Sequence, residues 1–238
     1  MSNINERGAS IVAVLLLSAD AVFIALHSMN ELIPFLDNRL LSLEEEQGYG
    51  DVFQYVKWFW IVLLLVYVSI RRRSLLYVSW ALVFAYLLCD DALSIHQTVG
   101  LRLASVFGLT PRFGLRPQDF GELAVTAAAG TILLGLVAWA YWRGSQAFRS
   151  TSRDLLLLIL ALVFFGVIVD MVHAAIRFGS TGYAIMGTIE DGGEMVVTSL
   201  MVWYAFLLSV RDEDAHSYLW DSLPVARLRH SAWGRARS

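Results

Sequence analysis

The chain has 238 residues, of which 57% are hydrophobic and only 16% are charged, and its formal net charge is −3. Soluble domains carry about 25% charged residues, so this composition and the long apolar runs predict an integral membrane protein. The slightly acidic balance excludes a bulk basic surface, and we expect no nucleic-acid partner. Cys89 is the single cysteine, which excludes an internal disulfide.

Six apolar segments follow one another along the chain, each with the ~20 residues that an α-helix needs to cross a bilayer. A helix satisfies its own backbone hydrogen bonds in lipid. We therefore predict an all-α fold, a polytopic membrane helical bundle of six transmembrane helices, in residues 1–211. Residues 212–238 are expected to form a partly disordered cytoplasmic tail. The predicted spans are residues 9–29, 52–71, 74–99, 118–142, 154–177 and 188–210.

Arginines are unevenly distributed between the two ends of this predicted bundle. The N-terminus, the loops near residues 71–73 and 143–153 and the C-terminal tail share one side, and they hold most of them. Because positive loops stay inside, both termini are predicted to be cytoplasmic, in a multi-pass protein of the cell (inner) membrane.

Acidic and histidine side chains occur in five of the six spans and, in this topology, near the outer end of each. Ionisable groups inside a span are costly and usually mark a functional site. The opposite halves, for example residues 155–169 and 196–208, contain neither type. The residues of this layer are Asp20, His27, Asp90, Asp91, His96, Glu122, Asp170, His173, Glu190, Asp191 and Glu194.

Such a layer contains many carboxylates and few nearby cations. Uncompensated carboxylates in a membrane would take up protons, whereas a divalent metal held by carboxylate and imidazole groups compensates them directly. We expect Glu190 and Asp191 to act as general bases or to orient a ligand. The expected metal ligands are Asp91, His96, Glu122, Asp170, His173, Glu194 and His27.

Helical spacing tests which of these residues share a face. Asp170 and His173 are three residues apart and align, whereas Asp91 and His96 are five apart and align poorly, so either one of Asp90, Asp91 and His96 points elsewhere or the third span is distorted. Other residues have structural interpretations. Asp20 is expected to be a hydrogen-bond partner between helices, and Asp90 a cap. Asp191 has a second interpretation as a charge near a helix N-terminus, and the adjacent glycines 192 and 193 are expected to permit close helix approach.

The ligand pattern resembles the dimetal carboxylate centres of four-helix proteins, which use single Glu residues on two helices and Glu-x-x-His on two others. Asp170-x-x-His173 matches one such pair, with Asp in place of Glu, and Glu122 and Glu194 match the single carboxylates. The resemblance implies iron or manganese and oxidative chemistry.

Zinc is the alternative metal, because His27, His96 and His173 come from three different spans. In this respect the chain is similar to the alkaline ceramidases, which are zinc-dependent intramembrane lipid hydrolases. Those enzymes have seven spans and a paired-His motif on the last, where this chain has Glu190-Asp191-Gly-Gly-Glu194.

Four strings carry a further resemblance: CDDALSIHQ, DFGELAV, VIVDMVHAAIRF and IEDGGEMVVTSL. They resemble uncharacterised bacterial six-span integral membrane proteins with the motifs DD-x4-H, D-x2-H and EDGGE. That resemblance implies a shared site and no established activity.

We therefore expect a membrane-embedded metalloprotein, with an enzyme acting on membrane lipid or a hydrophobic small-molecule substrate as the leading hypothesis. Dimetal oxidation is favoured, and hydrolysis by metal-bound water is the alternative. A proton or cation transporter, which predicts polar residues through the full membrane depth, and a structural membrane subunit are the other hypotheses. The sequence leaves the substrate and the oligomeric state open.

Overall fold

The computed structural model describes residues 2–32, 38–43, 47–176 and 181–211. Within these residues the chain is built from helices, and the only β-pairing is an isolated bridge between Arg112 and Leu115. The all-α prediction is confirmed. The predicted C-terminal tail, residues 212–238, lies outside the described residues.

Among the residues that the structure describes, five helical segments are long and apolar enough to cross a membrane. Four are the helices α1 (Ser2–Leu32), α2 (Tyr49–Arg71), α5 (Pro117–Arg143) and α8 (Thr181–Val210). The fifth joins α6 (Gln146–Val163), the π-helix η3 (Phe164–Val169) and α7 (Asp170–Ala175). The helices α3 (Tyr77–Leu93) and α4 (Ile95–Val106) pass the same test together, which makes six spans if this bent pair counts as one. A short 3-10 helix, η2 (Arg39–Leu41), precedes α2.

Local sequence signals set several of the helix ends. Pro117 occupies the first turn of α5, where its missing N–H costs nothing, and the Asp119 carboxylate accepts from the backbone N–H of Arg116 at 2.7 Å and from its guanidinium at 2.8 Å. The pKa of the Arg116 guanidinium is raised, first by its hydrogen bond to Asp119. Arg143 lies in the last turn of α5, where a cation favours the helix dipole. The hydroxyl of Ser145 caps α6 by accepting from Phe148 N at 3.3 Å.

The third predicted span, residues 74–99, is broken into α3 and α4. Ser94 adopts a left-handed conformation (φ 47°, ψ 46°), which ends α3, and α4 leaves at an angle of 71°. Close contact with α5 fixes the new direction. A Cβ on Gly100 would lie 2.6 Å from the backbone nitrogen of Glu122, so only glycine fits there.

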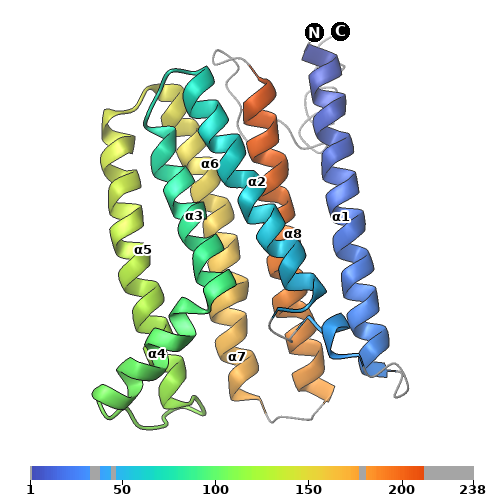
Figure 1. Cartoon of the computed structure of the whole chain (residues 1–238), viewed down its shortest axis with the longest axis vertical. Helices are drawn as coiled ribbons and strands as arrows, with labels where there is room; N and C mark the ends of the chain where they lie inside the picture. Colours follow the sequence, from blue (N-terminus) through green and yellow to red (C-terminus); the bar gives the residue numbers. More distant parts are fainter. Residues whose placement is uncertain (1, 33–37, 44–46, 177–180, 212–238) are drawn as a thin grey trace, which may run out of the picture.

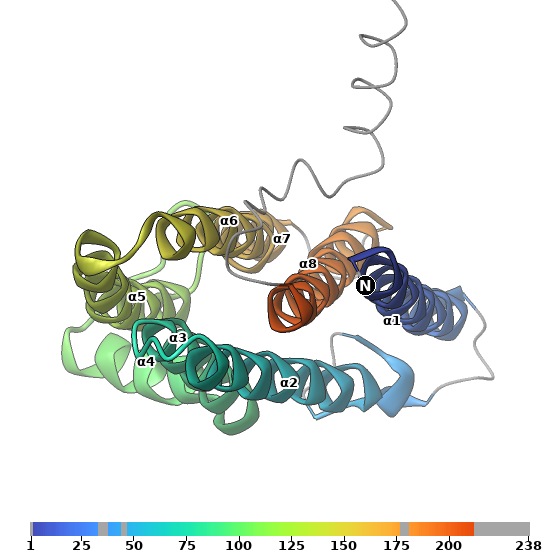
Figure 2. The ribbon, with the colours of Figure 1, turned by 90° about the horizontal axis from the view of Figure 1, so that it is seen from above.

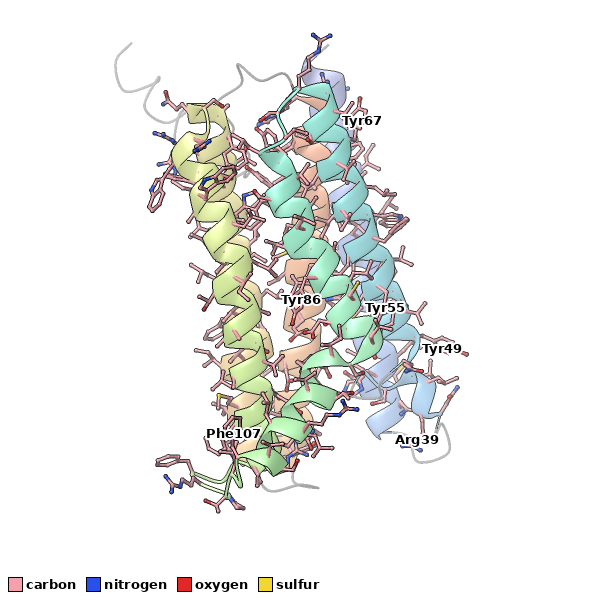
Figure 3. All side chains as sticks on the ribbon, turned by 60° about the vertical axis from the view of Figure 1, so that its left-hand side comes forward. Arg39, Tyr49, Tyr55, Tyr67, Tyr86 and Phe107 are labelled. Carbon is pink, nitrogen blue, oxygen red and sulfur yellow. The ribbon has the colours of Figure 1, made fainter. Side chains whose placement is uncertain are left out.

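The helices form one bundle in which α8 packs against α1, α2, α6 and η3 (Figure 2). α1 begins and α8 ends at the same end of the bundle, while α4 lies across the opposite end (Figure 1). Tyr67 lies toward the first end, and Arg39, Tyr49 and Phe107 lie toward the second (Figure 3). The apolar core fills the half nearer the first end, with Ile61, Leu65, Trp80, Phe84 and Met201 fully buried.

Candidate functional site

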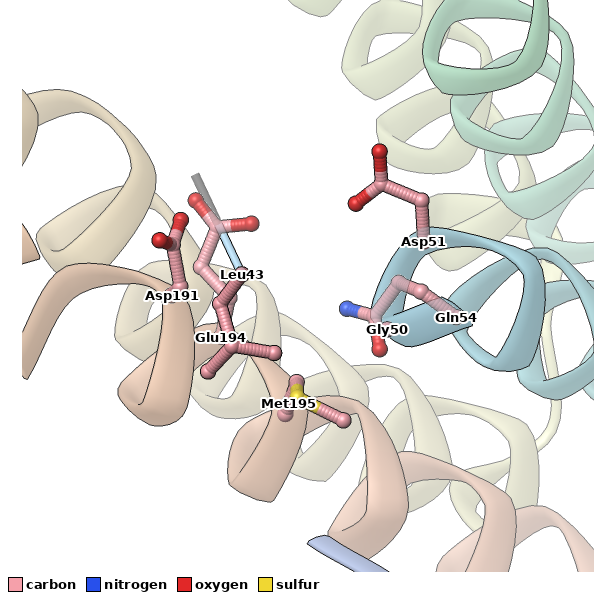
Figure 4. Close-up of a pocket in the computed structure, with 7 residues that line it drawn as sticks. All are labelled: Leu43, Gly50, Asp51, Gln54, Asp191, Glu194 and Met195. Carbon is pink, nitrogen blue, oxygen red and sulfur yellow. The ribbon is translucent and has the colours of Figure 1, made fainter. Parts of the chain in front are cut away.

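A cavity of about 190 Å³ lies among α2, the α3–α4 bend and α8, in the half of the bundle that contains α4. Four carboxylates and one histidine line it, and none of its described lining residues is Lys or Arg. A smaller pocket continues it, where Asp51 of α2 faces Asp191 and Glu194 of α8 (Figure 4). The lining residues of the larger cavity are Leu43, Asp51, Gln54, Tyr55, Asp91, Ser94, His96, Gln97, Asp191 and Glu194.

His96 is held at the start of α4 by Asp90. The Asp90 carboxylate contacts the imidazole Nδ1 at 3.0 Å and accepts from the backbone N–H of His96, also at 3.0 Å. The hydroxyl of Tyr86 donates to the same carboxylate at 3.4 Å. Asp90 therefore caps α4, as expected, and it turns the other ring nitrogen, Nε2, of His96 away from itself.

Asp91 does not contact His96 and is hydrogen-bonded to a tryptophan instead. The indole N–H of the buried Trp58 donates to its carboxylate at 2.7 Å, a charge-assisted hydrogen bond. The bend at Ser94 explains why Asp90, and not Asp91, is the partner of His96: the turn after α3 brings α4 back over the preceding carboxylate.

A second histidine, His173 on α7, repeats this arrangement. Its Nδ1 lies 2.6 Å from the carboxylate of Glu190 on α8, and the ring of Tyr183 packs on it with centroids 4.1 Å apart. Its Nε2 is buried and has no hydrogen-bond partner within the described part of the chain. Asp170, one turn before His173, shares a hydrogen bond with Glu190.

The π-helix η3 directly precedes Asp170 and determines which face of the helix it occupies. One-turn π-segments inside α-helices are frequently found at functional sites. Two glycines let α8 approach this segment. A Cβ on Gly166 would collide with the carboxylate of Glu194, and a Cβ on Gly193 would collide with the ring of Phe165.

On the other side of α8, a Cβ on Gly192 would meet Ile24 of α1 at 3.1 Å. The prediction that Gly192 and Gly193 permit close helix approach is confirmed. α8 begins at Thr181, so Asp191 lies three turns inside it, and the interpretation of Asp191 as an N-terminal helix charge was wrong.

Glu194 interacts electrostatically with charged groups from four other helices. They are Asp91, Asp170, Asp51 and His96, from α3, α7, α2 and α4. Glu122 of α5 accepts from Gln118 at 2.6 Å and is an electrostatic neighbour of His96. The fold thus brings six of the seven predicted ligands into one region. They are Asp91, His96, Glu122, Asp170, His173 and Glu194.

The seventh predicted ligand, His27 on α1, has other partners. Its Nδ1 accepts from Leu43 N at 3.1 Å, and its Nε2 lies 3.2 Å from the hydroxyl of Thr188. That hydroxyl donates to a backbone carbonyl, so it accepts from Nε2–H. Both ring nitrogens therefore serve to fix the chain around Leu43, at the rim of the cavity.

Asp20 has a cation as its partner, which the sequence did not reveal. Lys57 of α2 donates to it at 3.1 Å, and both side chains have no exposed surface. Lys57 also donates to Met195 O at 2.9 Å. The pair joins α1, α2 and α8, so the expectation that Asp20 bonds between helices is confirmed, and Asp20 adds no uncompensated charge to the layer.

Several cavity residues were missed. Asp51 stands in the first turn of α2, where a carboxylate is usually explained by the helix dipole. Its spacing of three from Gln54, which faces the same cavity, was the available signal. Tyr55, Ser94 and Gln97 had no signal in the sequence.

Among the residues that the structure describes, no group of three or more His, Cys, Asp or Glu side chains is arranged to hold a metal ion. Six of the seven predicted ligands are engaged in hydrogen bonds with protein groups, namely His27, Asp91, His96, Glu122, Asp170 and His173. Metal binding would therefore require carboxylates such as Asp91 and Glu194 to rotate about their side-chain torsions.

The fold and the cavity together define a polytopic helical bundle with a polar, carboxylate-rich pocket near one end of its apolar helices. A family model described as a domain of unknown function, DUF8692, matches residues 9–210, and the chain belongs to this family. The match extends through α1 to the end of α8. Comparisons with curated proteins and with solved structures found no match. The resemblance to an uncharacterised family is thus supported, and bacterial origin stays a prediction.

Proposed function

We propose that this protein is a membrane-embedded metalloprotein that binds divalent metal between the two histidine–carboxylate pairs. One observation carries the proposal: His96 and His173 each turn Nδ1 toward a carboxylate, which leaves Nε2 to a ligand. Metal-ligating histidines almost always donate their other ring N–H to a carboxylate, a carbonyl or water. For His173 that remaining nitrogen is buried and has no partner among the described residues.

Electrostatics supports a cation at this place. Asp51, Asp91, Asp191 and Glu194 line one cavity, and no Lys or Arg is among its described lining residues. Carboxylates so close together in a poorly solvated site must either take up protons or bind a cation. A divalent ion compensates two of them at once and uses the histidines as well.

The distribution of groups favours two metal ions. Asp91, His96 and Asp170 are electrostatic neighbours of Glu194, whose carboxylate also lies against Gly166. Asp91 and His96 would hold one ion and Asp170 and His173 the other, with Glu194 available to either. The mixed oxygen and nitrogen donors suit manganese or iron, with zinc as the alternative.

The wider proposal is an enzyme acting on a lipid or another hydrophobic substrate. The cavity is near the end of membrane-crossing helices, where a lipid headgroup and the first carbons of its chains lie. Bound metal would supply oxygen activation or, with zinc, a hydrolytic nucleophile. Asp191 lines the cavity and is proposed as the general base. Glu190 contacts His173 and is proposed to orient it.

Proton or cation conduction is the second candidate, because polar contacts continue inward from the cavity. Gln54 donates to Thr198 at 2.8 Å, and the Lys57–Asp20 pair lies one turn further along α2. Beyond that pair, most of the buried side chains of α2 and α8 are apolar, including Ile61, Leu65 and Met201, which have no exposed surface. This apolar layer ranks conduction below metal chemistry.

Titration of the purified full-length protein with Mn²⁺, followed by the loss of the free-ion electron paramagnetic resonance signal, tests the proposal. We expect saturable binding that His96→Ala and His173→Ala each weaken by at least tenfold, consistent with the ~10–100-fold effect of weaker perturbations around such sites. Asp154→Asn is the matched control. This buried carboxylate accepts from Tyr204 at 2.8 Å in the other half of the bundle, and its loss should leave Mn²⁺ affinity unchanged. Equal binding by all four proteins, or no binding by any, would reject the proposal.

A further inference from the structure

α4 and the turn after it carry large apolar side chains on the outside of the bundle. The exposed fraction is 77% for Val106, 71% for Phe107 and 90% for Phe113, and Leu101 is 56% exposed. Phe107 lies toward the end of the bundle that contains α4 in Figure 3. An exposed apolar group of this size usually marks contact with a partner or a membrane.

The direction of α4 indicates that these apolar side chains contact a membrane and not a partner protein. After the 71° bend at Ser94, α4 no longer follows the spans but lies across the end of the bundle (Figure 1). This is the level at which the membrane-crossing helices α5 and α8 reach their ends. Helices in the plane of a bilayer interface bury apolar side chains at the boundary between headgroups and acyl chains.

Charge on the same segment complements a phospholipid headgroup. Arg102 and Arg112 are exposed, and within the described residues neither side chain forms an ion pair. Arg116, by contrast, is already bound to Asp119 at 2.8 Å. Guanidinium groups bind phosphate oxygens through paired N–H donors. Two unpaired arginines beside exposed phenylalanines therefore offer a phosphate-binding group next to an acyl-chain contact.

We propose that residues 95–116 form an interfacial anchor that inserts Phe107 and Phe113 into the bilayer and binds the phosphate of an anionic phospholipid through Arg102 and Arg112. The anchor also holds α4, and with it His96, against α5 through the close approach of Gly100 and Gly121. The anchor does not depend on metal in the neighbouring cavity. A negative result in the lipid-binding test therefore leaves the metal proposal standing, and a negative metal titration leaves the anchor standing.

The role of the two arginines is tested by lipid binding to the full-length protein in detergent. Binding of short-chain phosphatidylglycerol and of phosphatidylcholine is measured by native mass spectrometry. Each arginine near an anionic headgroup contributes about fivefold in affinity. We expect preferential phosphatidylglycerol binding that Arg102→Gln with Arg112→Gln weakens about 25-fold. The matched control, Arg7→Gln with Arg73→Gln, removes two exposed arginines at the opposite end and should have no effect. Equal loss in both double variants, or competition by inorganic phosphate as strong as by lipid, would overturn the proposal.

Insertion is tested separately by spin labelling, because Cys89 is the only cysteine. In a Cys89→Ala background, a nitroxide at Phe113→Cys should be more accessible to oxygen than to a water-soluble nickel reagent, in protein reconstituted into phosphatidylglycerol-containing bilayers. Leu63→Cys, 50% exposed in the middle of α2, provides the lipid reference, and Arg73→Cys provides the aqueous one. A label at position 113 with the accessibility of the aqueous reference would contradict insertion.

Discussion

The buried pair of Asp20 and Lys57 leads to a quantitative prediction about the bundle. Lys57 has no exposed surface, and its ammonium group contacts Asp20 at 3.1 Å, Met195 O at 2.9 Å and the hydroxyl of Ser199 at 3.4 Å. Lys57→Met removes the ammonium group that donates all three hydrogen bonds. One carboxylate oxygen of Asp20 already has no hydrogen-bond partner within the described residues, so the variant leaves the whole carboxylate buried and unpaired.

Removing one member of a buried ion pair typically costs about 3–5 kcal/mol, because the other charge stays uncompensated. For a chain of this size, 1 kcal/mol shifts the unfolding midpoint by about 2–4 °C, so Lys57→Met should lower it by about 6–20 °C. Asp20→Asn should cost less, since Lys57 keeps two acceptors on α8. The double variant should recover much of the loss, because it leaves no charge buried.

Thermal unfolding of the purified proteins in one detergent, followed by far-ultraviolet circular dichroism, measures this cycle. The two single substitutions should be strongly non-additive, as expected for groups in contact. A double variant whose loss equals the sum of the single losses would refute the assignment of this pair as a structural link. Mn²⁺ affinity should stay unchanged in any variant that remains folded, because neither group is proposed as a ligand.

Three further substitutions, with Gly130→Ala as the control for the first, test the geometry around the cavity. Gly193→Ala should destabilise the fold by about 1–3 kcal/mol through overpacking against η3, whereas Gly130→Ala, with no atom within 4 Å of the added Cβ, should be neutral or stabilising by up to ~1 kcal/mol in the same unfolding assay. Asp90→Asn should weaken Mn²⁺ binding about 10–100-fold by releasing His96, and an unchanged affinity would reject that orienting role. Ser94→Gly should raise stability by about 1 kcal/mol, because φ at this position is positive, and a loss of stability would contradict the left-handed bend.

The layer of acidic and histidine residues was predictable from the sequence because topology alone fixes depth. Once apolar length sets the spans and they alternate in direction, residues near the outer end of each span fall in one plane. Asp91, Glu122, Asp170 and Glu194 lie on four different helical elements and still come together in this way. The spacing of five between Asp91 and His96 left two alternatives, a side chain that points elsewhere or a distorted span, and the structure places a break between the two residues, at Ser94.

The pairings within the layer were not predictable, because they depend on helix rotation and on local breaks. Because of the bend at Ser94, His96 contacts Asp90 and not Asp91. No proline or glycine stands at the bend to signal it in the sequence. The π-helix likewise has no clear signature in the apolar run before Asp170. Lys57 and Asp20 are 37 residues apart, and only packing of α1 against α2 and α8 shows that they meet.

Elemental analysis of the full-length protein, purified without added metal, tests whether the bundle holds a bound metal ion. We expect manganese, iron or zinc in at least equimolar amount in the wild type and in Asp154→Asn. The metal should be largely lost from His173→Ala, whose side chain has a buried nitrogen without a partner among the described residues. A wild-type protein that is folded, binds none of these metals as purified and takes up none on addition would contradict the account.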